Sequence, residues 1–191
     1  MRFFRDGQAE YVTVDRFLPT VLTNSRWKNG QPYEALVFAN AGEGATRYAG
    51  LGLWVALAEK AYAQWEGEQA GYVGIERGSG LEGGRARDAL EHITGRQAHS
   101  RTIGKGDWMA EMLNALYEGK HIVLSTKEFA AQISDPRLVK NHAYLLTAIG
   151  SRANIFEVLN PWKKDNQKGP AATTLTLDEL VANFSGFTWV D

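Results

Sequence analysis

The chain has 191 residues, of which 44% are hydrophobic and 23% are charged, and its formal net charge is −1. This length allows one well-packed core but is short for two full domains, and the composition is that of a globular protein, not a disordered one. The near-neutral charge excludes a strongly basic field of the kind that attracts nucleic acid or an anionic membrane. We therefore expect a single domain over residues 1–191, with neither nucleic acid nor a membrane as partner.

The chain contains no cysteine. This excludes disulfides, thiolate zinc sites and a thiol nucleophile made by this chain alone. No apolar run is long enough to span a bilayer, and the N-terminus lacks the uninterrupted apolar stretch of a signal peptide. Because a lack of cysteine fits reducing and oxidising compartments alike, it does not indicate a location.

The first predicted elements are strands. Residues 9–20 alternate in a pattern with β-branched side chains that predicts a strand ended by Pro19. Residues 25–34 are rich in turn formers. Residues 34–40 form a short apolar run flanked by turn residues, which is typical of a buried strand.

Helices follow in the middle of the chain. Apolar residues recur at three- and four-residue steps over 51–67, so this segment predicts a helix that Gly67 stops. The glycine-rich segment 71–85 predicts a loop, and 85–95 predicts a short helix ended by Gly95.

Another helix is predicted over 106–119, where Asp107 is placed to cap the start and Gly119 to close the end. A strand is predicted over 121–128.

Strands dominate the last part of the chain. Residues 141–150 and 153–160 predict two strands joined by a polar turn, Thr176 is placed to cap a short helix over 177–184, and a strand closes the chain at 187–190. This order of elements predicts an α+β fold with a mostly antiparallel sheet. We expect that sheet to be barrel-like or strongly twisted, with two to three helices packed on it.

The hairpin over 141–160 carries a histidine and an asparagine. If its turn centres near Ser151, His142 lies directly opposite Asn160, with Cβ atoms about 4.5–5.5 Å apart. A shift of the centre by one residue would make the partner Val158 or Trp162 instead.

Such a pair has a chemical use. A catalytic base must reach its nucleophile while a third group holds its ring in the right tautomer. A neutral amide such as Asn160 can orient His142 without burial of another anion, and Trp162 could keep water off the bond. The alternative for the two residues taken alone is a satisfied polar pair in a half-buried sheet. No histidines or carboxylates have a metal-ligand spacing.

Five motifs carry a resemblance to the calpain family of cysteine proteases. His-Ala-Tyr from His142 and Asn-Pro-Trp from Asn160 resemble the histidine and asparagine motifs of that family. The segments 53–67, 12–20 and 88–95 are similar to its Trp-bearing helix, its valine-rich strand with Leu-Pro, and its short helix ending in Thr-Gly. The motifs occur in the family's order.

The resemblance implies a papain-like protease core that lacks its cysteine helix. His142 would be the general base and acid, Asn160 its orienter and Trp162 its shield. The cysteine would lie on an absent upstream segment or on a separate chain, and the substrate would be a polypeptide. We expect this chain to be the C-terminal part of such an endopeptidase and to be inactive by itself.

Departures from the family pattern bear on cofactors. Lys163 replaces the usual glycine after Asn-Pro-Trp, and the calcium-binding acidic residues of animal calpains have no convincing match. Asp165, Asp178 and Glu179 lie in that part of the chain, but we assign no calcium site to them. No cofactor and no metal are therefore expected.

Two other functions compete with the protease. One is a catalytically inactive pseudoprotease or peptide-binding module that keeps the fold without the nucleophile. The other is a hydrolase of a different class that uses Ser100, Ser125 or Thr126, although no nucleophile elbow surrounds these residues.

Overall fold

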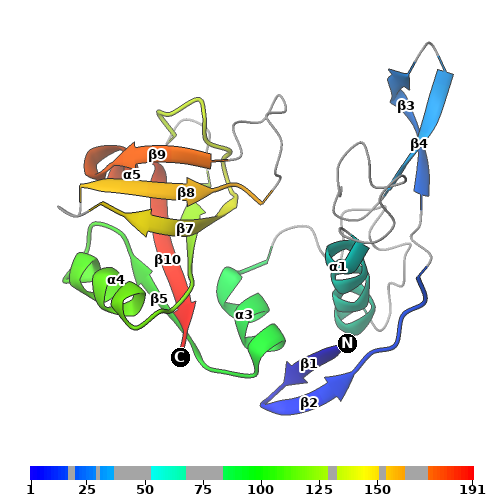
Figure 1. The fold of residues 1–191 in the computed structure, drawn as a ribbon, viewed down its shortest axis with the longest axis horizontal. Helices are drawn as coiled ribbons and strands as arrows, with labels where there is room; N and C mark the ends of the chain where they lie inside the picture. Colours follow the sequence, from blue (N-terminus) through cyan, green and yellow to red (C-terminus); the bar gives the residue numbers. More distant parts are fainter. Residues whose placement is uncertain are drawn as a thin grey trace. The chain divides into compact units, whose positions relative to one another are not determined.

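The computed structural model describes residues 1–16, 20–28, 31–36, 53–67, 84–128, 133–150, 154–161 and 172–191. These residues belong to two compact units, 1–84 and 85–191, which are drawn in Figure 1. The single domain expected from the sequence stays a prediction, because compactness does not say whether the two units unfold together. Of the loop predicted over 71–85, residues 71–83 lie outside the described residues.

The first unit contains two antiparallel hairpins and one helix. In the first hairpin, Arg2 pairs with Tyr11 and Arg5 with Gln8 across a two-residue turn. Asp6 and Gly7 both have positive φ in that turn, of 50° and 76°, which is the Asp-Gly signature of a tight hairpin. The elements are β1 Arg2–Arg5, β2 Gln8–Tyr11, β3 Thr20–Lys28, β4 Gln31–Leu36 and α1 Leu53–Glu66.

Two predictions for this unit differ from the structure, one of a strand and one of turns. The strand expected over 9–20 is β2, which ends at Tyr11. The Val12 N–H still donates to Met1 O at 2.8 Å, and Val12 and Val14 pack against the Phe3 cluster. The segment 25–34 was predicted as turns, yet β3 and β4 pair through it as far as Lys28 and Gln31.

Helix α1 confirms the helix predicted over 51–67. It ends where the N–H of Gly67 donates to Ala63 O at 3.0 Å. Its buried face includes Ala61 and Trp65, and the Trp65 ring lies 5.4 Å from that of Phe3. This small aromatic cluster holds the β1–β2 hairpin against the helix.

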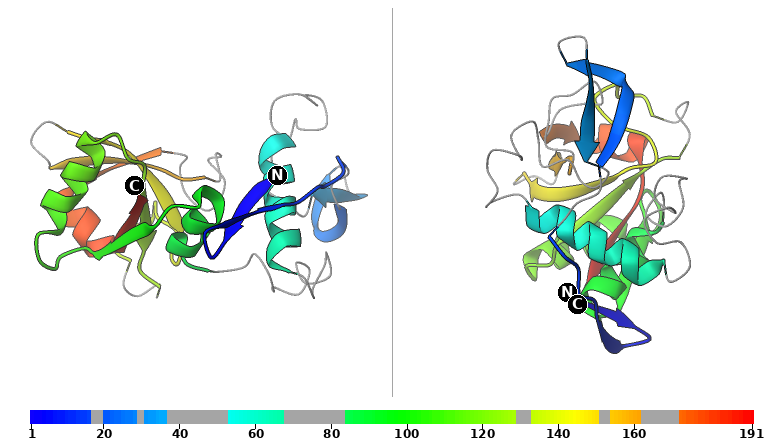
Figure 2. Two further views of the ribbon diagram at one scale, coloured as in Figure 1. Left: turned by 90° about the horizontal axis from the view of Figure 1, so that it is seen from below. Right: turned by 90° about the vertical axis from the view of Figure 1, so that its right-hand side faces the viewer.

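The second unit is built on a six-stranded antiparallel sheet in the order β5-β10-β6-β7-β8-β9. Figure 1 shows β7, β8 and β9 of this sheet side by side, and Figure 2 gives two further views. The strands are β5 Ala98–Thr102, β6 Ile122–Thr126, β7 Ala143–Ile149, β8 Ile155–Leu159, β9 Ala172–Thr176 and β10 Phe184–Val190. The α+β class with mostly antiparallel pairing is confirmed. The barrel-like alternative was wrong, because β5 and β9 are the two edges of this sheet and do not pair with each other.

Three described helices contact this sheet: α3 Ala86–Thr94, α4 Trp108–Tyr117 and α5 Leu177–Asn183. Gly95 ends α3 in the left-handed conformation with φ of 69°. Thr176 caps α5 through a capping box with Glu179, as the sequence predicts. Asp107 precedes α4 but makes no side-chain cap bond, because its backbone is not extended there.

The core of the second unit lies between the sheet and these helices. Side chains alternate along β6 and β9, so one face of each strand is buried. The sequence did not indicate β5 or β9, because both are polar edge strands with little apolar alternation. The largest fully buried apolar side chains are Tyr144, Phe156, Phe184, Phe187, Met112 and Ile122. No described helix is long and apolar enough to cross a bilayer.

Candidate active site

The β7–β8 hairpin has a different register from the one expected. Leu145 pairs with Leu159 and Leu146 with Val158, so continuation of the ladder places Tyr144, and not His142, opposite Asn160. The predicted direct pairing was wrong because the pairing is not centred at Ser151. Beside the turn Ile149 pairs with Phe156, and a bulge after Leu146 then shifts the register by one residue, so the open end of the hairpin has the alternative register, centred one residue further along the chain.

The two side chains meet despite this register. His142 Nε2 lies 3.0 Å from Asn160 Oδ1. His142 precedes β7 and Asn160 follows β8, so the contact runs diagonally across the open end of the hairpin, within reach of long side chains. Because an amide oxygen only accepts, Nε2 carries the hydrogen of this bond.

Asn160 is 1% exposed, whereas His142 is half-buried. A buried amide oxygen gives the imidazole a hydrogen-bond acceptor and selects the tautomer with hydrogen on Nε2. In the neutral ring the basic lone pair then lies on Nδ1. The arrangement can therefore orient a histidine for proton transfer through Nδ1.

Trp162, the predicted shield of this bond, lies outside the described residues. Pro161 is the last residue of that segment that the structure describes, and it is exposed. The role of Trp162 therefore stays a prediction.

Two residues that the motifs did not assign to the site contact His142. Thr126, at the end of β6, hydrogen-bonds its main chain, and the Tyr144 ring packs edge-on against the imidazole with centroids 5.2 Å apart. Burial raises the pKa of the Tyr144 phenol, so its hydroxyl stays protonated. The predicted strand 121–128 placed Thr126 near the end of a strand, but only the pairing of β6 with β7 brings it to His142.

The segment that leads to His142 is fixed by buried polar groups. Asn183 Oδ1 accepts from the N–H of Ser134 at 2.8 Å and of Asp135 at 3.1 Å. The Arg137 guanidinium forms hydrogen bonds of 2.6 and 2.9 Å to the Asp135 carboxylate. These bonds hold the pKa of Asp135 below its usual value, although burial acts in the opposite direction.

The contacts of Ser100 and Thr126, two of the three residues considered for a serine or threonine hydrolase, give that function no support. Thr126 Oγ1 donates to Val139 O at 2.8 Å and accepts from the His142 N–H. Ser100 Oγ bonds Thr188 Oγ1 at 3.0 Å. These hydroxyls are used in structural hydrogen bonds within the sheet and its loop.

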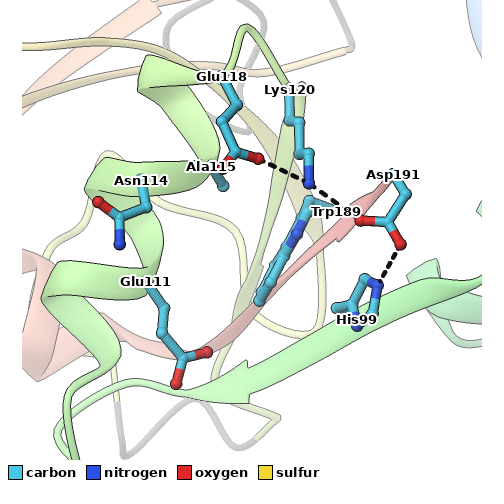
Figure 3. A pocket seen from close by; sticks show the side chains of 8 residues that line it. All are labelled: His99, Glu111, Asn114, Ala115, Glu118, Lys120, Trp189 and Asp191. Atoms are coloured by element: carbon cyan, nitrogen blue, oxygen red, sulfur yellow. Dashed lines mark hydrogen bonds and ion pairs between the residues drawn. The ribbon is translucent and has the colours of Figure 1, made fainter.

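A surface hollow of about 220 Å³ lies elsewhere in the second unit, between α4 and the ends of β5 and β10 (Figure 3). Lys120 bonds Glu118 and Asp191, each at 2.9 Å, and these bonds raise the pKa of Lys120. Bonds from His99 and Lys120 lower the pKa of Asp191. Charged side chains in the lining of this hollow therefore pair with one another. The lining residues are His99, Glu111, Asn114, Ala115, Glu118, Lys120, Trp189 and Asp191.

Within the described part of the chain, no group of three or more metal-ligating side chains lies together. Asp178 and Glu179 both lie in the first turn of α5, where Glu179 accepts from the Thr176 N–H in the capping box. Asp165 lies outside the described residues.

A histidine oriented by a buried asparagine is the arrangement that papain-like proteases use together with a cysteine. Comparison with known proteins points to the same class. The model of the calpain family cysteine proteases matches residues 1–177. This match covers most of the chain, which belongs to the calpain family of cysteine proteases, a family of thiol-dependent hydrolases.

Individual relatives agree with this assignment. The calpain-1 catalytic subunit of Mus musculus is 30% identical over 176 residues, which cover 86% of this chain and 21% of the relative. The calpain-2 catalytic subunit of Gallus gallus is 29% identical over 174 residues, 84% of this chain and 21% of the relative. Calpain-9 of Mus musculus is 32% identical over 129 residues, 61% of this chain and 17% of the relative. The chain thus spans about a fifth of the length of these relatives.

Proposed function

We propose that this chain supplies the histidine and asparagine of a calpain-like cysteine endopeptidase with a papain-like core. The nucleophilic cysteine would come from an upstream segment or a separate chain, since this chain has none. The observation that carries the proposal is the 3.0 Å bond between His142 Nε2 and the buried Asn160 Oδ1. Family membership supports it, and we propose a polypeptide as the substrate.

In the proposed reaction, the thiolate of the partner cysteine attacks the scissile carbonyl and forms a carbon–sulfur bond. Imidazolium His142 donates its Nδ1 proton to the leaving amine as the carbon–nitrogen bond breaks. His142 then takes a proton from water, whose oxygen attacks the thioester and releases the acid and the thiolate. Asn160 keeps the ring in one orientation through both proton transfers.

The test compares peptide hydrolysis by this chain alone and by the chain joined to, or mixed with, its cysteine-bearing partner. We expect no hydrolysis from the chain alone. In the complete enzyme, His142→Ala should lower kcat/KM by at least about 10³-fold, because members of such a catalytic unit act together. His121→Ala, which removes an exposed histidine at the start of β6, is the matched control. Full activity in His142→Ala would exclude the proposed role.

A second function is favoured by the lack of cysteine itself: a catalytically inactive pseudoprotease or peptide-binding module. It predicts binding of unfolded polypeptide with no hydrolysis, even when a cysteine-bearing segment is supplied. Binding of a labelled peptide that His142→Ala leaves unchanged, in a complex that never cleaves it, would favour this module over the protease.

A further inference from the structure

Thr126 is a buried threonine at the end of β6, and it is 4% exposed. We infer that it is a positioning residue for His142: its hydroxyl fixes the main chain from which the imidazole extends. The catalytic meaning of this inference rests on the proposed function, whereas the geometry on which it is built does not.

The hydroxyl replaces one bond of the β6–β7 ladder. The pairing of Ser125 with Ala143 continues to Thr126 and His142, whose main chains share the bond from Thr126 N to His142 O at 3.0 Å. In a regular antiparallel pair the His142 N–H would donate to the main-chain carbonyl of Thr126. It donates instead to Thr126 Oγ1 at 2.9 Å.

The single proton of the same hydroxyl has two carbonyl acceptors within reach, Val139 O at 2.8 Å and His142 O at 3.1 Å. The shorter bond, to Val139 O, closes the loop before the strand. Between these two contacts the chain passes through Asn141, whose φ is 46° and whose N–H donates to Lys127 O at 3.0 Å. A single side chain therefore holds both ends of a tight turn that ends at His142.

Tyr144 also holds this turn, through contacts with Val139 and with the His142 ring. Its hydroxyl accepts from the Val139 N–H at 2.9 Å, and its ring, 1% exposed, packs edge-on against the imidazole at 87°. With both polar main-chain groups of Val139 bonded to side chains, the turn has little freedom to move. Since functional geometry must be held to about 0.5 Å, the position of this turn decides whether His142 reaches Asn160.

Only a hydroxyl at position 126 both accepts from an N–H and donates to a carbonyl. Thr126→Val keeps the shape but removes both bonds, whereas Thr126→Ser keeps both bonds and removes a methyl group. Thr173→Val is a matched control: Thr173 is also a buried strand threonine, at 4% exposed, and its hydroxyl has no hydrogen-bond partner among the described residues.

The experiment uses NMR on the ¹⁵N-labelled chain as it stands, with the His142 ring nitrogens and the Hε2 proton as probes. We expect the Nε2–H tautomer in the unmodified chain, in Thr126→Ser and in Thr173→Val. In Thr126→Val the ring signals should shift, and Hε2 should exchange with water at least about tenfold faster.

An unchanged His142 ring in folded Thr126→Val would overturn the inference. If Thr126→Val does not fold, Thr126→Ser decides: ring signals that differ from those of the unmodified chain would mean that the methyl group, and not the hydroxyl, sets the position. The NMR measurement needs no cysteine, so a negative result contradicts the role of Thr126 without contradicting the proposed peptidase activity. In an active complex, Thr126→Val should lower kcat while KM changes little.

Discussion

At the scale of single residues, the candidate site depends on buried polar side chains that bond the main chain or the His142 ring. Asn160, Thr126 and Asn183 are each at most 4% exposed, and each bonds other groups of the second unit through its side chain. Buried polar groups with partners specify one arrangement, because any other arrangement leaves them unsatisfied in a low-dielectric interior. This explains how a short loop can present His142 in one orientation.

Asp135 gives this principle a pH-dependent test. Its pKa is lower in the folded chain because of the bonds from Arg137, so the carboxylate stabilises the fold above its unfolded pKa of about 3.9. Asp135→Asn should lower the free energy of unfolding at pH 7 by about 1–2 kcal/mol. As the pH falls through the folded-state pKa of Asp135, the original chain loses the stabilisation that the carboxylate provides. The difference in free energy of unfolding between the original chain and Asp135→Asn should therefore become smaller below about pH 4. Urea unfolding of both chains at several pH values measures this difference in free energy of unfolding.

Asp107→Asn is the control for the loss of one negative charge, since Asp107 is exposed and makes no capping bond. Equal pH profiles for Asp135→Asn and the original chain would show that the pair with Arg137 contributes nothing to the pH dependence.

At the scale of elements, strand β10 is an inner strand of the sheet and lies between β5 and β6. It bulges between Phe184 and Gly186 where it pairs with β6. A Cβ atom at Gly186 would lie 2.7 Å from the main-chain oxygen of Arg101 on β5. The glycine therefore permits a close approach of two strands that a side chain would prevent.

We expect Gly186→Ala to destabilise the second unit by about 1–3 kcal/mol, because main-chain atoms must move apart to admit the methyl group. Thermal unfolding followed by circular dichroism measures the change. Ser185→Ala, at the exposed neighbouring position, should change stability by less than about 1 kcal/mol. Equal unfolding temperatures for Gly186→Ala and the original chain would mean that β5 and β10 are not held this closely.

At the scale of the whole molecule, the second unit has the larger described core. Fifteen buried apolar residues form one cluster there, whereas three form the cluster of the first unit. Residues 85–191 also contain every strand of the six-stranded sheet. A core of this kind in about a hundred residues is within the range of domains that fold alone.

We therefore expect a fragment of residues 85–191 to unfold cooperatively and to keep the Nε2–H tautomer of His142. Urea unfolding followed by tryptophan fluorescence, with NMR of the histidine ring, tests both points. A fragment without cooperative unfolding would favour the single domain over 1–191 that the sequence predicts.

Local signals in the sequence determined much of this protein. Apolar periodicity and terminal glycines located α1, α3 and α4, a capping threonine located α5, and short apolar runs located β6, β7 and β8. Each signal acts within one segment, so each could be recognised there. The order of short motifs likewise led to the calpain family, which the comparisons confirm.

The tertiary structure decided what depends on contacts between segments. The bulge after Leu146 and the pairing of Ile149 with Phe156 set the β7–β8 register. The polar edge strands β5 and β9 exist only as partners of other strands, and Thr126 reaches His142 through pairing of β6 with β7. The sequence named His142 and Asn160, but pairing across the sheet determined how they meet. The physical reason is that register and side-chain hydrogen bonds are settled by cross-strand neighbours, which no single segment contains.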